Sequence, residues 1–431
     1  MTNSIENVAV IGSGVMGAGI AAHCANSGCK VLLLDIVKNE EDRDAVANSA
    51  VRGMMGSNPE MLMHKRNSKL ITTGNTEDDL SKLSDVDWVI EVVIENLDVK
   101  RDLYSDISRH IGNDTIVSSN TSTIPRTKLV EGMKGEMASR FLITHFFNPP
   151  RYLPLLEVVT ADEVDYSVTE RLCSFADNRL GKRVIMCNDT PGFIGNRLGV
   201  YFIQRALKAT LDHGLTIEQA DAMLSRPIGV PKTGVFGLMD LVGIDLVPHV
   251  TASLLENLPK DDPFQEIAGT GGEIIEAMLA EGYTGRKGKG GFYRLNTDGG
   301  KRVKEARDLV TGEYNTADRR AAFPSAKMGK QGLGRLIDYP DKGAKLVADV
   351  LLDTLSYAAH IVPEASENIH SIDTAMKVGY NWKKGPFEMM DSIGVTSMVE
   401  RLKASGRGVP MMLVEAAKKG SFYDMADKEP T

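Results

Sequence analysis

Four polar residues have side chains that could take part in proton transfer, and they stand near the ends of predicted strands or early in a predicted helix. They are Ser122, His145, Glu157 and Asn196. Removing hydride from an alcohol carbon requires a base for the hydroxyl proton, and histidine suits this role because its unperturbed pKa is near 6.5. His145 is therefore the candidate base of an alcohol oxidation.

Glu157 is the candidate partner of His145. It lies in the apolar segment 153–159, where a carboxylate would be costly to bury without a partner. A carboxylate at the second ring nitrogen would fix the tautomer and stabilise the imidazolium, as an orienting acid does in other triads. The competing interpretation of His145 is a core histidine whose hydrogen bonds are satisfied.

A glycine-rich turn follows the apolar run 8–11, which is predicted to be the first strand. Gly12, Gly14 and Gly17 have the GxGxxG spacing, and a good helical sequence follows. The first glycine permits a tight turn, the second lets the backbone approach a pyrophosphate, and the third allows close packing of helix on strand. The new helix offers its unpaired N–H groups and positive dipole end to phosphates. An ordinary strand–turn–helix is the alternative.

The second predicted strand, 30–34, ends at Asp35. An acid at this position can take both ribose hydroxyls of NAD and would repel the extra phosphate of NADP, so the motif predicts NAD. The predicted cofactor contacts in this motif are Gly12, Gly14, Val15, Met16, Gly17 and Asp35.

These residues need a doubly wound sheet to position them, and the pattern of the first 188 residues predicts one. Strand-like runs alternate with helical patterns, and ligands of such sheets bind beyond the carboxyl ends of the strands, where His145 lies. The charged, methionine-rich stretch 39–67 is predicted to be a helix or helical pair inserted in the sheet topology. The later strands are predicted at 88–93, 115–117, 141–144, 155–159 and 184–186.

The pattern becomes largely helical after Asp189-Thr190-Pro191, where Asp or Thr can cap a helix that begins with proline. The segment 234–243 is repeated at 385–394, and Phe292-Tyr293 recurs at Phe422-Tyr423, although matches this short could arise by chance. We therefore predict an α/β chain: a Rossmann-type domain at 1–188, then two related all-α domains at 189–295 and 340–431, joined by a linker at 296–339.

Composition limits the function classes. The chain has 431 residues, 42% of them hydrophobic and 25% charged, as in ordinary globular proteins. A formal charge of −8 argues against a nucleic-acid binder. The cysteines and histidines lack metal-ligand spacing, so no metal site is predicted. No apolar run reaches about 18 residues, so no membrane span is expected. The first strand begins within ten residues of the start, so we expect no signal peptide and a cytoplasmic location.

Several of these motifs together resemble the L-3-hydroxyacyl-CoA dehydrogenases. The resemblance spans residues 7–295, and the repeat at 340–431 resembles the second helical domain of multifunctional fatty-acid oxidation enzymes. Such enzymes often carry an enoyl-CoA hydratase domain, of which this sequence contains none, so the chain could be an excised part of a longer bifunctional protein. The motifs that carry the resemblance are 12–20, 91–96 with Lys100, 119–122, 145–149 with Glu157, and 189–193 with Asn196-Arg197.

The resemblance implies roles for individual residues. His145 would be the catalytic base with Glu157 as its partner, and Ser122 and Asn196 would bind the reacting oxygen and nearby substrate. The residues on the cofactor side would be Asp35, Glu95, Lys100 and Asn120. Lys65 and Lys69, on the inserted segment, could meet the phosphates of coenzyme A, although a solvated helix face is the equal alternative.

The resemblance therefore implies oxidation of a 3-hydroxyacyl-CoA thioester to a 3-ketoacyl thioester with NAD, within fatty-acid β-oxidation. Two other functions fit the same fold: an NAD-dependent dehydrogenase of a hydroxy acid that is not a thioester, or a dehydrogenase-like binding module without turnover. Because two helical copies could pair within one chain, we expect a monomer rather than the homodimer that single-copy relatives would need.

Overall fold

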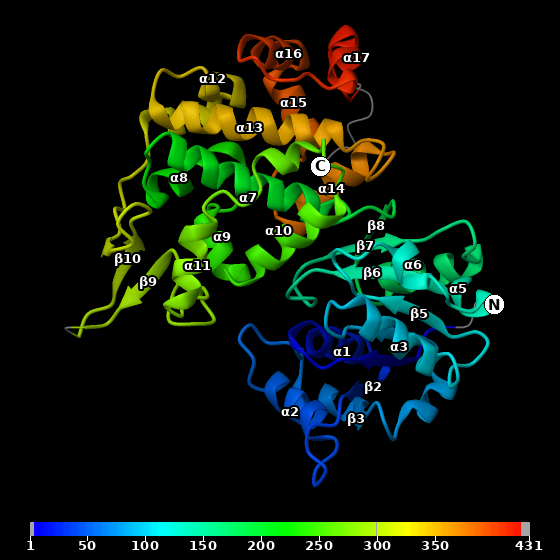
Figure 1. Ribbon diagram of the computed structural model, residues 1–431. Helices are drawn as coiled ribbons and strands as arrows, with labels where there is room; N and C mark the ends of the chain where they lie inside the picture. The colour runs from blue at the N-terminus through cyan, green and yellow to red at the C-terminus, as the bar shows by residue number, and fades with distance from the viewer. Residues whose placement is uncertain (1–3, 299, 424–431) are drawn as a thin grey trace. The chain divides into compact units, whose positions relative to one another are not determined.

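The computed structural model describes residues 4–298 and 300–423. The chain divides into two compact units, and the division falls between Phe193 and Ile194. Figure 1 shows a sheet with helices in the first unit and mainly helices in the second.

The first unit is built on an eight-stranded sheet in the order β3-β2-β1-β4-β5-β6-β7-β8. The strands from β3 to β6 are parallel, β7 is antiparallel to β6, and β8 is parallel to β7. The elements of this unit are β1 (Asn7–Ile11), α1 (Val15–Asn26), β2 (Lys30–Asp35), α2 (Ala45–Met54), η1 (Lys65–Leu70), β3 (Ile71–Asn75), η2 (Leu80–Asp85), β4 (Trp88–Glu91), α3 (Leu97–Ile107), β5 (Ile116–Ser119), α4 (Arg126–Val130), α5 (Gly135–Ala138), β6 (Phe141–Phe146), β7 (Leu155–Val159), α6 (Tyr166–Asn178) and β8 (Arg183–Cys187).

Nearly continuous apolar strands make the middle of this sheet, as expected for strands covered on both faces. One face packs against α1, α2 and α6, with Trp88 and Phe175 in edge-to-face contact at 6.0 Å. On the other face Tyr104 of α3 meets Phe141 of β6 in the same geometry at 5.0 Å. The parallel strands have their carboxyl ends on the same side of the sheet. The residues that follow β1, β2, β4, β5 and β6 are therefore brought together on that side.

The predicted Rossmann-type sheet is confirmed, with three local corrections. Strand β3 was not predicted, because Ile71-Thr-Thr-Gly-Asn75 has a weak apolar signal and forms the sheet edge. Strand β5 begins and ends later than the predicted 115–117. The insertion at 39–67, predicted to be a helix or a helical pair, contains one short helix, α2, and the start of the 3₁₀ turn η1, so only the helical-pair alternative is wrong.

A fourth correction concerns Asp189, which does not cap the helix that follows it. Its carboxylate accepts the backbone N–H groups of Arg126 (2.5 Å) and Thr127 (2.8 Å), at the start of α4. The next helix begins only at Gly195, because Gly192 and Phe193 both have positive φ angles, 75° and 49°, which are not helical. Asp189 therefore joins two distant segments of the first unit.

The second unit is mainly helical and includes a small three-stranded sheet. No single helix among the described residues is long and apolar enough to cross a membrane. Helices α9 (Phe236–Val242) and α10 (Leu246–Asn257) meet the same limits of length and composition only when they are taken together, as a bent pair. The elements are α7 (Gly195–Asp212), α8 (Ile217–Met223), η3 (Arg226–Ile228), α9 (Phe236–Val242), α10 (Leu246–Asn257), η4 (Pro263–Glu266), α11 (Gly272–Ala280), β9 (Tyr293–Asn296), β10 (Val303–Arg307), β11 (Tyr314–Thr316), η5 (Pro324–Gln331), α12 (Leu333–Ile337), α13 (Lys342–His360), α14 (Ile369–Gly379), α15 (Pro386–Ile393), α16 (Val395–Ala404) and α17 (Met411–Lys419).

The same buried hydrogen-bond network occurs twice in this unit. Asp221 of α8 accepts the N–H groups of residues 235–237 at the start of α9 and the hydroxyl of Tyr293 at 2.9 Å. Asp373 of α14 accepts the N–H groups of residues 387 and 388 in α15 and the hydroxyl of Tyr423 at 2.8 Å. In each copy one aspartate thus fixes the start of a helix to a distant tyrosine.

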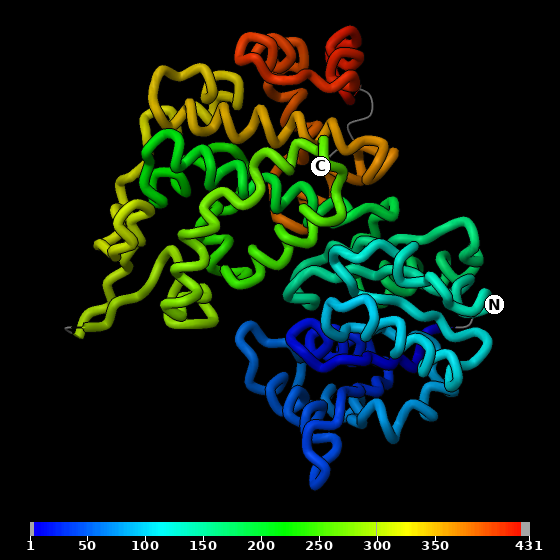
Figure 2. Tube along the Cα trace, in the orientation of Figure 1, coloured from blue at the N-terminus to red at the C-terminus, as the bar shows by residue number. Residues whose placement is uncertain are grey.

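A second network is duplicated beside the first. Asp240 accepts the N–H groups of Phe292 and Tyr293, and Asp391 accepts those of Phe422 and Tyr423. We call residues 194–295 the first helical repeat and residues 340–423 the second. Helix α7 of the first repeat packs along α13 of the second, as Figures 1 and 2 show. Both repeats belong to the same compact unit.

The segment 296–339, predicted as a linker, is an ordered part of the second unit apart from residue 299, which lies outside the described residues. It supplies β10 and β11, which extend from β9 in an antiparallel sheet. Arg307 is held there by both carboxylate oxygens of Glu281 at 2.9 Å. The second unit is therefore not purely α-helical, and Val303-Lys-Glu-Ala-Arg307 has no regular alternation that would have predicted a strand.

Candidate active site

His145 and Glu157 lie directly opposite each other on the antiparallel strands β6 and β7. The Nδ1 atom of His145 is 2.7 Å from Oε2 of Glu157. His145 is 6% exposed and Glu157 is fully buried. Side chains opposite each other in an antiparallel pair lie close enough to interact. The strand reversal at β7 therefore brings together the two residues that the sequence paired, with His145 inside β6 rather than beyond its end.

Two aromatic rings lie beside His145, and an amide binds the backbone of the next residue. The imidazole centroid is 4.6 Å from that of Phe147 and 5.8 Å from that of Phe193. Asn120, which follows β5, accepts the N–H of Phe146 through Oδ1 at 2.9 Å. The predicted cofactor residue Asn120 thus also fixes the end of the strand that carries His145.

The glycine turn has the shape that a dinucleotide phosphate requires. Gly12 has φ 101°, and a Cβ atom there would lie 2.5 Å from the carbonyl oxygen of Val92. A Cβ at Gly17 would lie 1.8 Å from the carbonyl oxygen of Gly12, whereas one at Gly14 would meet no described atom within 4 Å. Gly14 is the N-cap of α1. The open side of the turn therefore faces the N-terminus of a helix, which fits the pyrophosphate of NAD.

Asp35 ends β2 beside this turn. Its Oδ2 atom accepts the N–H of Ser13 at 2.6 Å and the Ser13 hydroxyl at 2.5 Å, and Oδ1 accepts the N–H of Ile36 at 2.7 Å. These donors hold the carboxylate at the carboxyl end of β2, where the ribose of a bound dinucleotide would lie. Val15 is 67% exposed and Met16 is half-buried, so both stand at the surface of the turn.

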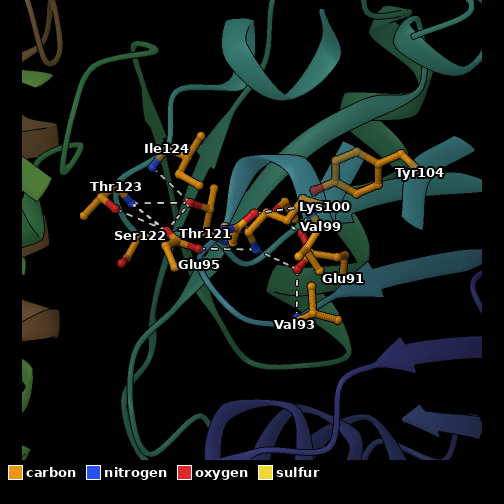
Figure 3. A network of polar contacts seen from close by, with 12 residues as sticks. Glu91, Val93, Glu95, Val99, Lys100, Tyr104, Thr121, Ser122, Thr123 and Ile124 are labelled. Atoms are coloured by element: carbon orange, nitrogen blue, oxygen red, sulfur yellow. Dashed lines mark hydrogen bonds and ion pairs between the residues drawn. The ribbon is translucent and has the colours of Figure 1, made fainter. Parts of the chain in front are cut away.

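A buried carboxylate, Glu91, organises the end of β4 (Figure 3). It is fully buried and accepts hydrogen bonds from Lys100 Nζ at 2.7 Å, the Tyr104 hydroxyl at 2.5 Å and the Ser119 hydroxyl at 2.6 Å. The N–H of Val93 adds a fourth bond at 2.8 Å. Burial, and the charge of Glu91, raise the pKa of Tyr104. Glu91 is not among the predicted site residues, although an acid in an apolar strand is a usable signal.

Lys100 connects Glu91 to Glu95. Its side chain is 1% exposed, and Nζ also lies 3.3 Å from Oε2 of Glu95. The ammonium is thus enclosed by two carboxylates. Within the first unit, Lys100 positions Glu95, which is the more exposed member with 37% of its side chain accessible.

Glu95 in turn holds the loop that carries Ser122. Its Oε1 atom accepts the Thr121 hydroxyl and the N–H groups of Ser122 (3.1 Å) and Thr123 (3.3 Å), as Figure 3 shows. Burial alone would raise the pKa of Glu95, but the Lys100 ammonium and the hydrogen bonds from Thr121 and Ser122 lower it below its usual value. Glu95 is therefore a carboxylate, and it fixes Ser122 after β5.

The remaining predicted residues lie elsewhere. Asn196 is half-buried in the first turn of α7, in the second unit. Lys65 and Lys69 are exposed on the 3₁₀ turn η1. Among the described residues no group of His, Cys, Asp and Glu side chains could hold a metal ion. The first unit thus brings together His145, Glu157, Asn120 and the Glu95–Ser122 loop at or near the carboxyl ends of the parallel strands.

Comparison with known families and proteins agrees with this arrangement. The model of the 3-hydroxyacyl-CoA dehydrogenase NAD-binding domain matches residues 7–190. The model of the C-terminal domain of the same family matches residues 192–295 and again 346–423. The two matches to the C-terminal domain coincide with the two helical repeats.

Three similar proteins illustrate the match. A Rickettsia felis protein, provisionally named a fatty acid oxidation complex trifunctional enzyme, is 39% identical over 90% of this chain and 53% of its own length. A Deinococcus radiodurans protein, provisionally named a 3-hydroxyacyl-CoA dehydrogenase, is 42% identical over 68% of this chain and 84% of its own. The crystal structure of Escherichia coli 3-hydroxybutyryl-CoA dehydrogenase is similar with a TM-score of 0.73 and 25% sequence identity. The match covers 98% of this chain and 100% of that one.

The chain spans about half the length of the first of these relatives and of two further curated ones. The family matches nevertheless extend over most of the chain, from the glycine turn to the second repeat. The chain therefore belongs to the 3-hydroxyacyl-CoA dehydrogenase family, and it includes that family's NAD-binding domain.

Proposed function

We propose that the chain oxidises the 3-hydroxyl group of an (S)-3-hydroxyacyl-CoA thioester to a ketone, with His145 as the general base, as a step of fatty-acid β-oxidation. The observation that carries this proposal is the 2.7 Å contact between His145 Nδ1 and the buried carboxylate of Glu157. A buried, oriented imidazole at the carboxyl end of a parallel strand is what removal of a hydroxyl proton next to a dinucleotide requires.

The tautomer of His145 follows from its partner. An ionised carboxylate can only accept hydrogen bonds, so Nδ1 carries a proton and donates it to Glu157. The Nε2 atom is then left as the acceptor that takes the proton of the 3-hydroxyl group. The imidazolium that forms is stabilised by the negative charge of Glu157 in a site of low dielectric constant.

The other site residues bind and orient. Ser122 and Asn196 would hold the substrate oxygen by hydrogen bonds, and Glu95 keeps Ser122 in place. Gly12, Gly14, Gly17 and Asp35 would hold the cofactor. Bound NAD supplies the hydride acceptor, so the carbon loses a hydride and the oxygen loses a proton.

The thioester carries a coenzyme A phosphate group that needs cationic partners, and Lys65 and Lys69 are the proposed ones. Their exposure on η1 leaves both ammonium groups accessible. Loop 57–64 before them is fixed to the end of α1, because Asn26 bonds to the backbone of Met61 (2.9 Å) and Met63 (2.8 Å). This anchoring supports a defined position for the two lysines.

The test uses the full chain with NAD and compares 3-hydroxybutyryl-CoA with free 3-hydroxybutyrate, followed by the absorbance of NADH. We expect turnover of the thioester only. Turnover of the free acid instead would favour a hydroxy-acid dehydrogenase, and no turnover of either would favour a binding module. A series of acyl chain lengths in the same assay gives the preferred substrate.

Two further proposals concern the context of the enzyme. The provisional name of the Rickettsia relative supports a fused or associated enoyl-CoA hydratase, which pull-down with a separately expressed hydratase domain would test. The internal pairing of the repeats supports a monomer, and a tight dimer at nanomolar concentration in sedimentation would contradict it.

No disulfide joins the four cysteines, all of which are described, and this supports a reducing, cytoplasmic location.

A further inference from the structure

Helix α7 carries Asn196 in its first turn, and the next residue is the most enclosed cation of the second unit. The guanidinium of Arg197 is fully buried. It donates to Asp262 of the first repeat through Nη2 at 2.5 Å. It also donates to two residues of the second repeat: from Nε to the Tyr357 hydroxyl at 2.9 Å, and from Nη1 to Glu364 at 2.8 Å.

The second-repeat partners hold the guanidinium from two directions. Glu364 accepts a further bond from Nη2 at 3.0 Å, so its contact with Arg197 is bidentate and sets the plane of the guanidinium. The hydroxyl of Tyr357 in turn donates a hydrogen bond to Asp262 Oδ1 at 3.0 Å. A single connected network therefore joins both repeats around one residue of the α7 first turn.

Further contacts with the second repeat follow along the same helix. The rings of Tyr201 and Tyr357 are stacked with centroids 4.0 Å apart, and Phe202 meets Trp382 edge-to-face at 5.1 Å. A Cβ atom on Gly199 would lie 2.0 Å from the Tyr380 hydroxyl, so only glycine allows this approach. The first half of α7 thus packs against several side chains of the second repeat.

Asn196 lies directly before the centre of this packing. It is half-buried in the first turn of α7, where the N-cap residue, Ile194, supplies no side-chain cap. The network around Arg197, the next residue, therefore helps to fix the position of this turn. We propose that Glu364 and Tyr357 of the second repeat are positioning residues for the reaction, acting through Arg197 to place the amide of Asn196. This inference rests on the proposed function, in which Asn196 contacts the substrate oxygen.

The experiment compares Glu364→Gln with Asp353→Asn in the full chain. Glu364 is 41% exposed, so glutamine fits there without a new burial cost. Asp353, in α13, is the control, because it also joins α7 to the second repeat by an ion pair with Arg205, and its other partner is Arg407. Arg205 lies about 12 Å further along α7 at a rise of about 1.5 Å per residue. We expect Glu364→Gln to lower kcat on the thioester about tenfold with an unchanged KM for NAD, and Asp353→Asn to change kcat less than about twofold.

A double variant separates positioning from general destabilisation. If Glu364 acts through Asn196, then Glu364→Gln combined with Asn196→Ala is no slower than Asn196→Ala alone, because the interaction is already lost. Tyr357→Phe is expected to behave like Glu364→Gln. Additive losses, or equal losses in the Glu364 and Asp353 variants, would overturn the proposal while leaving the proposed function intact.

Amide hydrogen exchange gives a readout that does not need turnover. We expect the peptide that covers the first turn of α7 to exchange about tenfold faster in Glu364→Gln and at the wild-type rate in Asp353→Asn. If the wild-type chain fails to oxidise the thioester, the proposed function is wrong, and exchange alone decides whether the second repeat fixes this turn. Unchanged exchange in Glu364→Gln would overturn the inference.

Discussion

Two histidines of the first unit are almost equally buried but have different partners. His145 is 6% exposed and His23, in α1, is 8% exposed. His145 faces the carboxylate of Glu157, whereas His23 has its Nε2 atom 3.0 Å from the carbonyl oxygen of Leu180. Because a carbonyl only accepts, Nε2 of His23 is the donor, and its buried Nδ1 has no hydrogen-bond partner among the described residues.

This difference shows what an acid does for a buried imidazole. Burial, together with the charge of Lys182, lowers the pKa of His23 to about 4, so it stays neutral inside the core. His145, by contrast, has the buried side chain of Glu157 at its Nδ1 atom, which is the acidic partner that His23 lacks.

The largest effect is expected from His145→Ala. Removing the general base should lower kcat on the thioester by about 10²–10⁴-fold with little change in the KM for NAD. Steady-state kinetics at pH 7 measures it. The matched control is His23→Gln, whose amide can still donate to the Leu180 carbonyl. We expect its kcat within about twofold of wild type, and comparable losses in both variants would contradict the assigned base.

The second largest effect is expected from Glu157→Gln. Glutamine keeps the shape of the side chain but can donate to Nδ1, which would reverse the tautomer and place a proton on the Nε2 atom that must act as the acceptor. We expect kcat to fall about 10²–10³-fold. Thermal unfolding distinguishes this from a folding defect, and a folded variant with wild-type kcat would show that the acid does not create the difference between the two histidines.

The stability of the chain should depend on His23 at acidic pH. Its folded pKa, about 4, is below the value of about 6.5 in an unfolded chain, so its contribution is complete above pH 6.5. As pH falls from 6.5 to 4, His23 binds a proton in the unfolded state but not in the folded state. The free energy of unfolding therefore falls by up to about 3 kcal/mol.

Denaturant unfolding between pH 4 and 7 measures this slope. His23→Gln removes the titrating group and should flatten the part of the slope that is due to it. An identical pH dependence in wild type and His23→Gln would show that His23 is not held neutral by burial.

The regular part of the fold could be predicted from the sequence, because local patterns determine it. Strand β7 coincides with the predicted segment 155–159, and the glycine turn and Asp35 lie where the motif placed them. The contact between His145 and Glu157 was also foreseen, since a buried acid needs a partner. Their catalytic roles, like those of Ser122 and Asn196, stay predictions.

What the sequence did not predict depends on long-range contacts. Asp189 looked like a local helix cap but binds the start of α4, and Glu91 gathers donors from α3 and β5 that no spacing rule connects. The 296–339 segment lacked apolar pairs because its strands form a small, partly exposed sheet. Asp189 and Glu91 thus bind residues of other elements, which a periodic pattern does not reveal, whereas the strands at 303–307 and 314–316 pair locally but have a weak apolar signal.

The smallest expected effect is that of Asn120→Ala. Asn120 supports His145 only through the backbone, by accepting the N–H of Phe146 at 2.9 Å. Its removal leaves that N–H without its partner, which should cost about 1–2 kcal/mol of stability and lower kcat up to about tenfold. Asn120→Asp keeps an acceptor at this position and should recover most of the stability, measured by thermal unfolding. If Asn120→Ala lowered kcat as much as Glu157→Gln does, strand placement rather than the buried acid would be what separates His145 from His23.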